Sequence, residues 1–235
     1  GGGKAANLGR LVRAGFRVPG GFVVTTDACR AGMIADVRAA IATAYRALDG
    51  NVSVAVRSSA TAEDMAGASM AGQYETYLDI RGEEAVLAAV EKCWASLRAA
   101  RATAYLAEQG VDAGAVAMAV VVQQLVPADV AGVLFTVNPN GSAASAQQEM
   151  VVEASWGLGE SVVSGRVQPD VLVLNKATGQ VLSERIGDKR EELRAGTTGE
   201  QAVSTERRKV LCLTPDQLPA LWQIGRRAED FFAAP

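Results

Sequence analysis

The chain has 235 residues, of which 49% are hydrophobic and 21% charged, a composition typical of a folded globular protein. Its net charge is −3, and this argues against nucleic acid or an anionic membrane as partner, since proteins that bind either are usually basic. The chain has no histidine, which excludes Ser-His-Asp and Cys-His catalysis, histidine metal ligands and a phosphohistidine carried on this chain. No stretch reaches the roughly 18 to 20 apolar residues of a membrane span. Three widely spaced cysteines indicate reduced thiols, as in a cytoplasmic protein.

The first elements alternate between helix and strand. Leu8, Leu11 and Val12 have the spacing of an apolar helix face, and residues 22–25 are predicted to form a strand. Residues 27–48 are predicted as one Ala- and Arg-rich helix that is weakest at its central glycine. Lys4 follows three glycines and precedes the first helix, a placement that suits phosphate binding but equally a solvated lysine.

Arg57 is predicted to stand at the end of a strand formed by residues 52–56. A loop of small and hydroxyl residues follows, including Ser58 and Ser59, and it would allow an anion to approach backbone N–H groups. An arginine there offers a planar fork to phosphate oxygens, although an ordinary surface loop is the alternative. A strand at 77–80 and a helix at 82–107 are predicted next.

Residues 117–126 form an apolar run that predicts a buried strand, with residues 132–136 as its hairpin partner across the turn at 127–129. Gln123 and Gln124 lie near the end of this strand. A buried amide needs hydrogen-bond partners, and an adenine base would supply them; an exposed pair at the strand end is the alternative.

The second half of the chain is predicted to contain more strands than helices. Residues 151–152 begin a strand, and residues 171–174 and 181–182 are expected to form a hairpin. Residues 187–209 are charged and read as a mobile surface loop, and a last helix is expected at 214–232 with Thr214 as its N-cap. This order predicts an α+β fold with substantial antiparallel sheet.

Four motifs together resemble one family. They are GGKAANLG, VAVRSSATAEDMAGASMAGQYETYL, AGVLFTVNP and EASWGLGESVVSG. They resemble the nucleotide-binding domain of the phosphoenolpyruvate synthase, pyruvate phosphate dikinase and rifampicin phosphotransferase family. The resemblance implies an ATP-grasp fold over residues 1–235, with two lobes, mixed or antiparallel sheets and flanking helices. We place the approximate sub-parts at 1–80 and 81–235.

The resemblance also implies roles for individual residues. Lys4 and Arg57 match the phosphate-binding cations and would be the catalytic residues on this chain. Gly72 and Thr76 match positions that line the phosphates. In the adenine pocket the family positions fall at Gln123 and at the backbone of Leu125 and Val126.

The implied activity is that of a larger phosphotransferase. It would split ATP to AMP and pass the phosphoryl group through a phosphohistidine domain to pyruvate, as in a phosphoenolpyruvate synthase. The family's Mg²⁺-binding Glu lies in a segment expected beyond residue 235, so we expect a chain truncated at its C-terminus and inactive alone. The stretch between Thr26 and Val52 also looks short for the family. A rifampicin phosphotransferase domain and a non-catalytic nucleotide-binding module are the alternatives.

Overall fold

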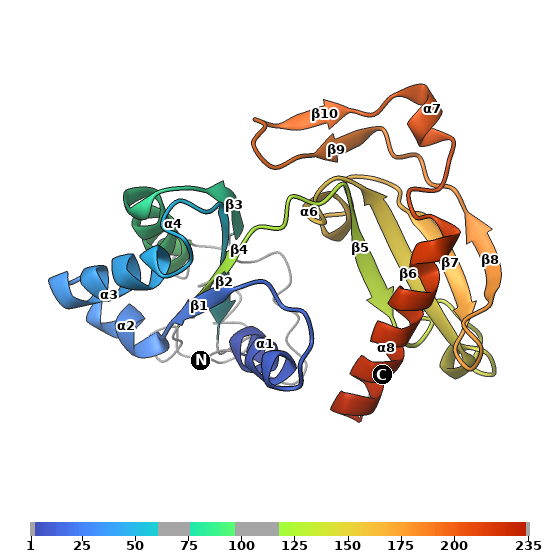
Figure 1. Ribbon diagram of the computed structural model, residues 1–235, viewed down its shortest axis with the longest axis horizontal. Helices are drawn as coiled ribbons and strands as arrows, with labels where there is room; N and C mark the ends of the chain where they lie inside the picture. The colour runs from blue at the N-terminus through green and yellow to red at the C-terminus, as the bar shows by residue number, and fades with distance from the viewer. Residues whose placement is uncertain (1–2, 61–75, 97–117, 234–235) are drawn as a thin grey trace, which may run out of the picture. The chain divides into compact units, whose positions relative to one another are not determined.

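The computed structural model describes residues 3–60, 76–96 and 118–233 and divides the chain into two compact units, Gly1–Val126 and Pro127–Pro235 (Figure 1). Each unit contains antiparallel sheet and helices, which confirms the predicted α+β class. The unit boundary falls at 126/127, whereas the sequence placed approximate sub-parts at 1–80 and 81–235. The first unit extends to 126 because the strand that ends at Gln124 belongs to its sheet.

The first unit is built on a four-stranded sheet. Its elements are α1 (Gly3–Arg13), β1 (Gly21–Val24), α2 (Thr26–Ala31), α3 (Ala35–Arg46), β2 (Val54–Ala60), β3 (Thr76–Ile80), α4 (Glu83–Ser96) and β4 (Met118–Gln124). The strand order is β1-β4-β2-β3, and every neighbouring pair is antiparallel. Helices α3 and α4 lie on one side of the sheet, and α1 lies on the other (Figure 1).

The two faces of this sheet differ in chemistry. Because side chains alternate along a strand, Val54 and Val56 of β2 share a face with Val120 and Val122 of β4. These valines are fully buried in a core completed by α3 and α4. The opposite face mixes buried apolar residues, Ala55 and Val121, with the polar side chains of Arg57 and Gln123.

The predicted single helix over 27–48 is wrong. The structure breaks it into α2 and α3 at Gly32, whose φ is +77°. That conformation cannot continue a right-handed helix, and glycine adopts it at little steric cost. The break lets α3 turn its own buried residues, Ile41 and Tyr45, toward the sheet.

The second unit holds another four-stranded antiparallel sheet, in the order β5-β6-β7-β8. Its elements are β5 (Val130–Phe135), the 3-10 helix Ala146–Gln148, β6 (Glu149–Trp156), α6 (Glu160–Val163), β7 (Asp170–Asn175), β8 (Val181–Arg185), β9 (Glu191–Leu193), β10 (Glu200–Ala202), α7 (Thr205–Arg208), the 3-10 helix Pro215–Gln217 and α8 (Leu218–Phe232). Helix α8 packs on a core around Met150, Leu172 and Leu174. The β7–β8 hairpin is confirmed, and the Gln217 side chain accepts a hydrogen bond from the Thr214 N–H at 2.8 Å at the predicted helix start.

The predicted hairpin between residues 117–126 and 132–136 is wrong. Strand β4 pairs with β1 on one edge and β2 on the other, so neither of its edges is left for β5. Strand β5 pairs instead with β6 in the second unit. Both strands exist where expected, but β4 pairs with strands far earlier in the chain, and β5 pairs with the strand that follows it, β6.

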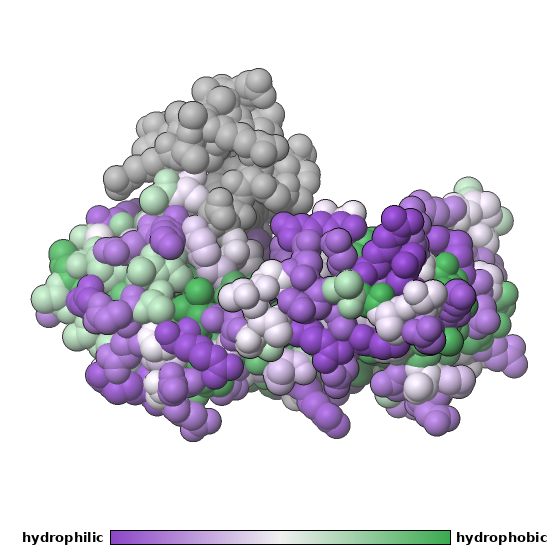
Figure 2. Space-filling model, turned by 90° about the horizontal axis from the view of Figure 1, so that it is seen from above, coloured by the Kyte–Doolittle hydropathy of each residue, from purple (hydrophilic) through white to green (hydrophobic). Residues whose placement is uncertain are grey.

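The described helices include none with the length and apolar character needed to cross a bilayer. On the face seen in Figure 2, hydrophilic residues of both units are interspersed with smaller hydrophobic patches. Some apolar surface is normal on a folded protein, because there is not enough polar surface to cover it completely.

The prediction of a mobile surface loop over 187–209 is also wrong. This segment forms β9, β10 and α7, and two of its charged residues are buried. Lys189 and Asp170 form an ion pair whose side chains are both 0% exposed. A buried charge is costly unless it is paired and hydrogen-bonded, and here both groups are.

The buried pair ties three segments together. The Asp170 carboxylate accepts hydrogen bonds from the Lys189 ammonium, from the Gly187 N–H at 2.8 Å and from the Cys212 N–H at 2.7 Å. The Lys189 ammonium also donates to the Gly187 carbonyl at 3.2 Å. Burial, together with the Asp170 carboxylate, raises the pKa of the Cys212 thiol to about 12, so that thiol stays protonated.

Lys189→Met should destabilise the protein by about 3–5 kcal/mol, because it leaves the buried Asp170 carboxylate without its cation. The double variant Lys189→Met/Asp170→Asn should recover part of that loss, since it removes the uncompensated charge. Urea denaturation followed by tryptophan fluorescence measures both.

Lys209→Met is the matched control, because Lys209 is exposed and should change stability by no more than about 0.5 kcal/mol. A Lys189→Met variant as stable as this control would show that the buried pair is not required.

Candidate functional site

Three of the sequence-predicted site residues lie on one face of the first sheet. Arg57 of β2 is directly opposite Thr76 of β3 and Val121 of β4. Gln123 is opposite Ala55, two residues before Arg57 on the same strand, so Gln123 and Arg57 are diagonal neighbours about 7–8 Å apart. Arg57, Thr76 and Gln123 therefore share the face turned away from the valine core.

Arg57 lies within a strand and not at its end. The sequence placed the strand end at 56, but β2 pairs with β4 without interruption to Ala60. Ser58 and Ser59, considered as phosphate donors in a loop, are consequently buried in the sheet. The exposed Arg57 side chain thus projects from a rigid strand, and within the described residues it has no carboxylate partner.

Lys4 reaches the same strand from helix α1. Its ammonium donates a hydrogen bond to the Ser58 carbonyl at 3.3 Å, directly after Arg57 in the chain. Helix α1 packs against β2 and β4. The structure therefore brings together the two cations that the sequence separates by more than 50 positions.

The two glutamines are both partly buried and hydrogen-bonded, which removes the alternative of an exposed pair. Gln123 donates from its side-chain amide to the Pro19 carbonyl at 3.1 Å, and Gln124 donates to the Leu48 carbonyl at 3.4 Å. The Leu125 N–H donates to the Ser53 carbonyl at 2.9 Å. Val126 is 55% exposed and ends the first unit. Gly72 lies outside the described residues.

A magnesium site does not emerge from the described residues. Within residues 3–60, 76–96 and 118–233, no group of three or more Cys, Asp or Glu side chains lies close enough to hold a metal ion. A hard cation such as Mg²⁺ requires oxygen ligands, carboxylates above all. Arg57, Thr76 and Gln123 supply no carboxylate, so the Arg57 face does not fit that requirement.

A second polar cluster, which the sequence did not indicate, lies in the second unit. Glu192 is buried, with 4% of the residue exposed, and its carboxylate accepts two hydrogen bonds from Arg207, at 2.7 and 3.1 Å. Arg194 also pairs with it at 3.0 Å. The Arg207 guanidinium stacks on Trp156, 4.3 Å from the ring centroid, and the Trp156 indole donates to the Arg207 carbonyl at 3.1 Å.

This cluster holds strand β9 against the glycine turn that follows β6. The Leu158 N–H donates to the Leu193 carbonyl at 2.7 Å. At Gly157, with φ +78°, a Cβ would stand 2.3 Å from that carbonyl oxygen, so only glycine fits. Burial opposes ionisation of Glu192, but hydrogen bonds from Arg207 and Arg194 outweigh it and lower the pKa of the carboxyl.

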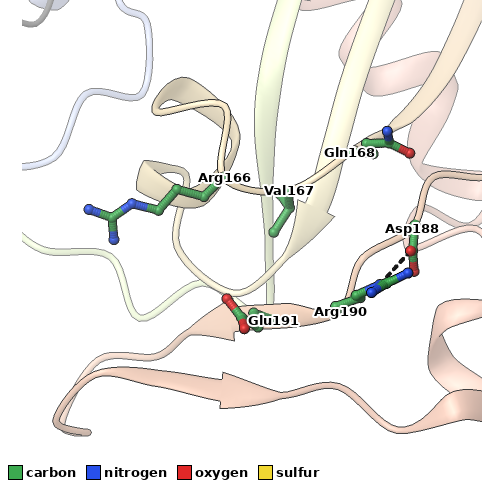
Figure 3. Close-up of a pocket in the computed structure, with 6 residues that line it drawn as sticks. All are labelled: Arg166, Val167, Gln168, Asp188, Arg190 and Glu191. Atoms are coloured by element: carbon green, nitrogen blue, oxygen red, sulfur yellow. Dashed lines mark hydrogen bonds and ion pairs between the residues drawn. The ribbon is translucent and has the colours of Figure 1, made fainter.

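A cavity of about 320 Å³ lies between the segment after α6 and strand β9 (Figure 3). Arg190 and Asp188 lie side by side on one wall of the cavity and form an ion pair of 2.6 Å, and Arg208 pairs with the same carboxylate. Arg166 pairs with Glu200 at 2.7 Å. Since the arginines around this cavity are matched by carboxylates, it lacks the excess positive charge that a phosphate group needs.

Comparison with known proteins identifies the family of the chain. The profile described as "Pyruvate phosphate dikinase, AMP/ATP-binding domain" matches residues 30–235. A probable phosphoenolpyruvate synthase of Methanothermobacter thermautotrophicus is 39% identical over 284 residues, covering 100% of this chain and 40% of the relative. A rifampicin phosphotransferase of a Streptomyces species is also 39% identical, over 278 residues, covering 100% of this chain and 32% of the relative.

The chain spans a minor part of these relatives. A phosphoenolpyruvate synthase of Pyrococcus furiosus, 42% identical over 194 residues, is matched over 78% of this chain and only 23% of its own length. The alignment of 284 positions to the Methanothermobacter protein is longer than the 235 residues of this chain, so that relative has additional residues within the matched region.

Glu192→Gln should destabilise the protein by about 1.5–3 kcal/mol near neutral pH, because it removes the charge that pairs with Arg207 and Arg194. Since the folded-state pKa of Glu192 is lowered, its stabilising contribution is full above about pH 4.3, the ordinary glutamate value, and is lost as pH falls through the folded pKa. Urea denaturation at neutral and acidic pH should therefore show the gap between wild type and variant closing in acid.

The adjacent Glu191→Gln is the matched control, since Glu191 is exposed on the same strand. It should change stability little at any pH. A gap for Glu192→Gln that stays constant with pH would contradict the assignment.

Proposed function

Because this chain belongs to the pyruvate phosphate dikinase AMP/ATP-binding domain family, we propose that it binds ATP on the Arg57 face of its first sheet. The observation that carries the proposal is the register of β2, β3 and β4, which gathers Arg57, Thr76 and Gln123 on one side of a rigid sheet. Family membership makes the nucleotide the expected ligand, and the register supports a particular place for it.

The phosphate end of the nucleotide is assigned to the cations. Arg57 offers a planar fork of N–H donors with a charge that no described carboxylate neutralises, and Lys4 lies beside the same strand. The Thr76 hydroxyl, directly opposite Arg57, adds a neutral donor. Gly72 would line the phosphates as well.

The base end is assigned to Gln123 and the segment after β4. The side-chain oxygen of Gln123 can accept from a base, because its NH₂ group donates to Pro19. Because the Leu125 N–H donates to the Ser53 carbonyl, we assign the adenine edge to the Leu125 carbonyl and the Val126 N–H, which have no backbone partner among the described residues. That pair supplies one acceptor and one donor, which matches the donor and acceptor of adenine.

The longer protein is proposed to be a phosphotransferase of the phosphoenolpyruvate synthase type. It would convert ATP to AMP, pass one phosphoryl group through a phosphohistidine domain to pyruvate and release the other to water as phosphate, with Mg²⁺ held by residues that the structure does not describe. Phosphoryl transfer to rifampicin is the second candidate, because a relative named rifampicin phosphotransferase is as similar, at 39% identity, as the Methanothermobacter synthase. A cytoplasmic location fits both activities.

Arg57→Ala should weaken ATP binding about 10- to 100-fold, equivalent to the roughly 1.5–3 kcal/mol of hydrogen bonds to a charged group. Isothermal titration calorimetry with ATP and magnesium chloride measures the change. Arg57→Lys, which keeps the charge but loses the fork, should fall between wild type and Arg57→Ala.

Arg38→Ala is the control, because Arg38 lies on α3, which packs on the valine side of the sheet. It should bind ATP like wild type. Absence of ATP binding by the wild-type chain would overturn the proposed function, and unaltered binding by Arg57→Ala would overturn the assigned site.

A further inference from the structure

The positive charge of this acidic protein is concentrated at its N-terminal end. The first 26 residues contain Lys4, Arg10, Arg13 and Arg17 and no Asp or Glu. The remaining residues carry 19 basic side chains against all 26 acidic ones. A segment of four positive charges therefore stands out against a chain whose net charge is −3.

This basic segment lies on the ligand face of the first sheet. Helix α1 packs on that side, with the Lys4 ammonium at the Ser58 carbonyl beside Arg57. The segment after α1 returns to the sheet at Pro19, whose carbonyl accepts the hydrogen bond from Gln123. Arg17 is two residues from this contact.

Arg13 and Arg17 are exposed, and neither has a carboxylate partner within the described part of the chain. Arg13 ends α1, and Arg17 lies in the connection between α1 and β1. Among the described residues, neither guanidinium makes a hydrogen bond that holds the fold together. Their charges are thus available to act on a solute that approaches the Arg57 face.

We propose that Arg13 and Arg17 steer ATP into the site by long-range attraction, and so set the association rate constant without contacting the bound nucleotide. The inference rests on the proposed function, since it concerns capture of the same ligand. Clustered charge of one sign near a binding face accelerates association of an oppositely charged ligand, and the effect falls steeply with ionic strength. The acidic remainder of the chain makes such a local attraction more necessary, because its own field repels a polyanion.

The test is stopped-flow association of a fluorescent N-methylanthraniloyl ATP with the full chain in excess magnesium chloride. Arg13→Gln/Arg17→Gln should lower the association rate constant about three- to tenfold at low salt, with a dissociation rate constant within about twofold of wild type. At about 1 M salt, where the screening length is about 3 Å, the wild-type chain and the double variant should bind the analogue with the same association rate constant. Circular dichroism and thermal unfolding confirm that the variant is folded.

Arg38→Gln/Lys92→Gln is the matched control, because it removes the same total charge from α3 and α4 on the opposite side of the sheet. It should leave association unchanged. Equal slowing by both double variants would show that net charge alone acts, and would overturn the proposal. The proposal would also be overturned if Arg13→Gln/Arg17→Gln lowered the affinity by raising the dissociation rate constant, because Arg13 and Arg17 would then contact the bound nucleotide.

The outcomes separate this inference from the proposed function. Wild-type chain that fails to bind the analogue defeats the proposed function. The proposed function stands if the wild-type chain binds the analogue and Arg57→Ala weakens binding through faster dissociation. If the association rate of Arg13→Gln/Arg17→Gln is then unaltered, only the steering proposal is overturned.

Discussion

The antiparallel register between β2 and β4 is the constraint on which the first unit depends. Pairing Arg57 with Val121 and Ala55 with Gln123 fixes which residues turn toward the valine core and which toward the Arg57 face. A shift of one residue would bury Arg57 against α3 and α4 and expose the valines, exchanging the two faces completely. Burial of the valines, each stabilised by about 1.5–3 kcal/mol relative to exposure, therefore also determines the position of the polar groups.

Local patterns predicted most strands of this protein, but not how the strands pair. The apolar run that became β4 was clear, yet its expected partner at 132–136 pairs with β6, because β1 and β2 occupy both edges of β4. Such pairing joins residues far apart in the chain, about which local periodicity carries no information. The prediction for residues 187–209 was wrong for another reason. Charged residues such as Lys189 and Glu192 are typical of a solvated loop, and they can be buried here only because each is paired with an opposite charge.

The candidate site was predicted through motifs and then refined by geometry. Arg57, Lys4 and Gln123 were singled out as residue types suited to a nucleotide, and the structure places them around one sheet face. The sequence could not show that Arg57 lies inside a strand, since small and hydroxyl residues such as Ser58 suit a loop equally well. It also could not show that Gln123 fastens the segment at Pro19, which is a contact between distant residues.

The arginines that the structure describes fall into two groups, those that form an ion pair with a carboxylate and those that do not. In the second unit Arg207 pairs with Glu192 and Arg208 pairs with Asp188, so their charges are neutralised by ion pairs that stabilise the fold. In the first unit, Arg57 on β2 and Arg17 in the connection between α1 and β1 have no such partner among the described residues. Because salt screens exposed charges separated by more than about 8 Å at physiological ionic strength, unpaired arginines near a binding face act on an anion more strongly than acidic groups farther away. An acidic protein can on these grounds present a cationic site.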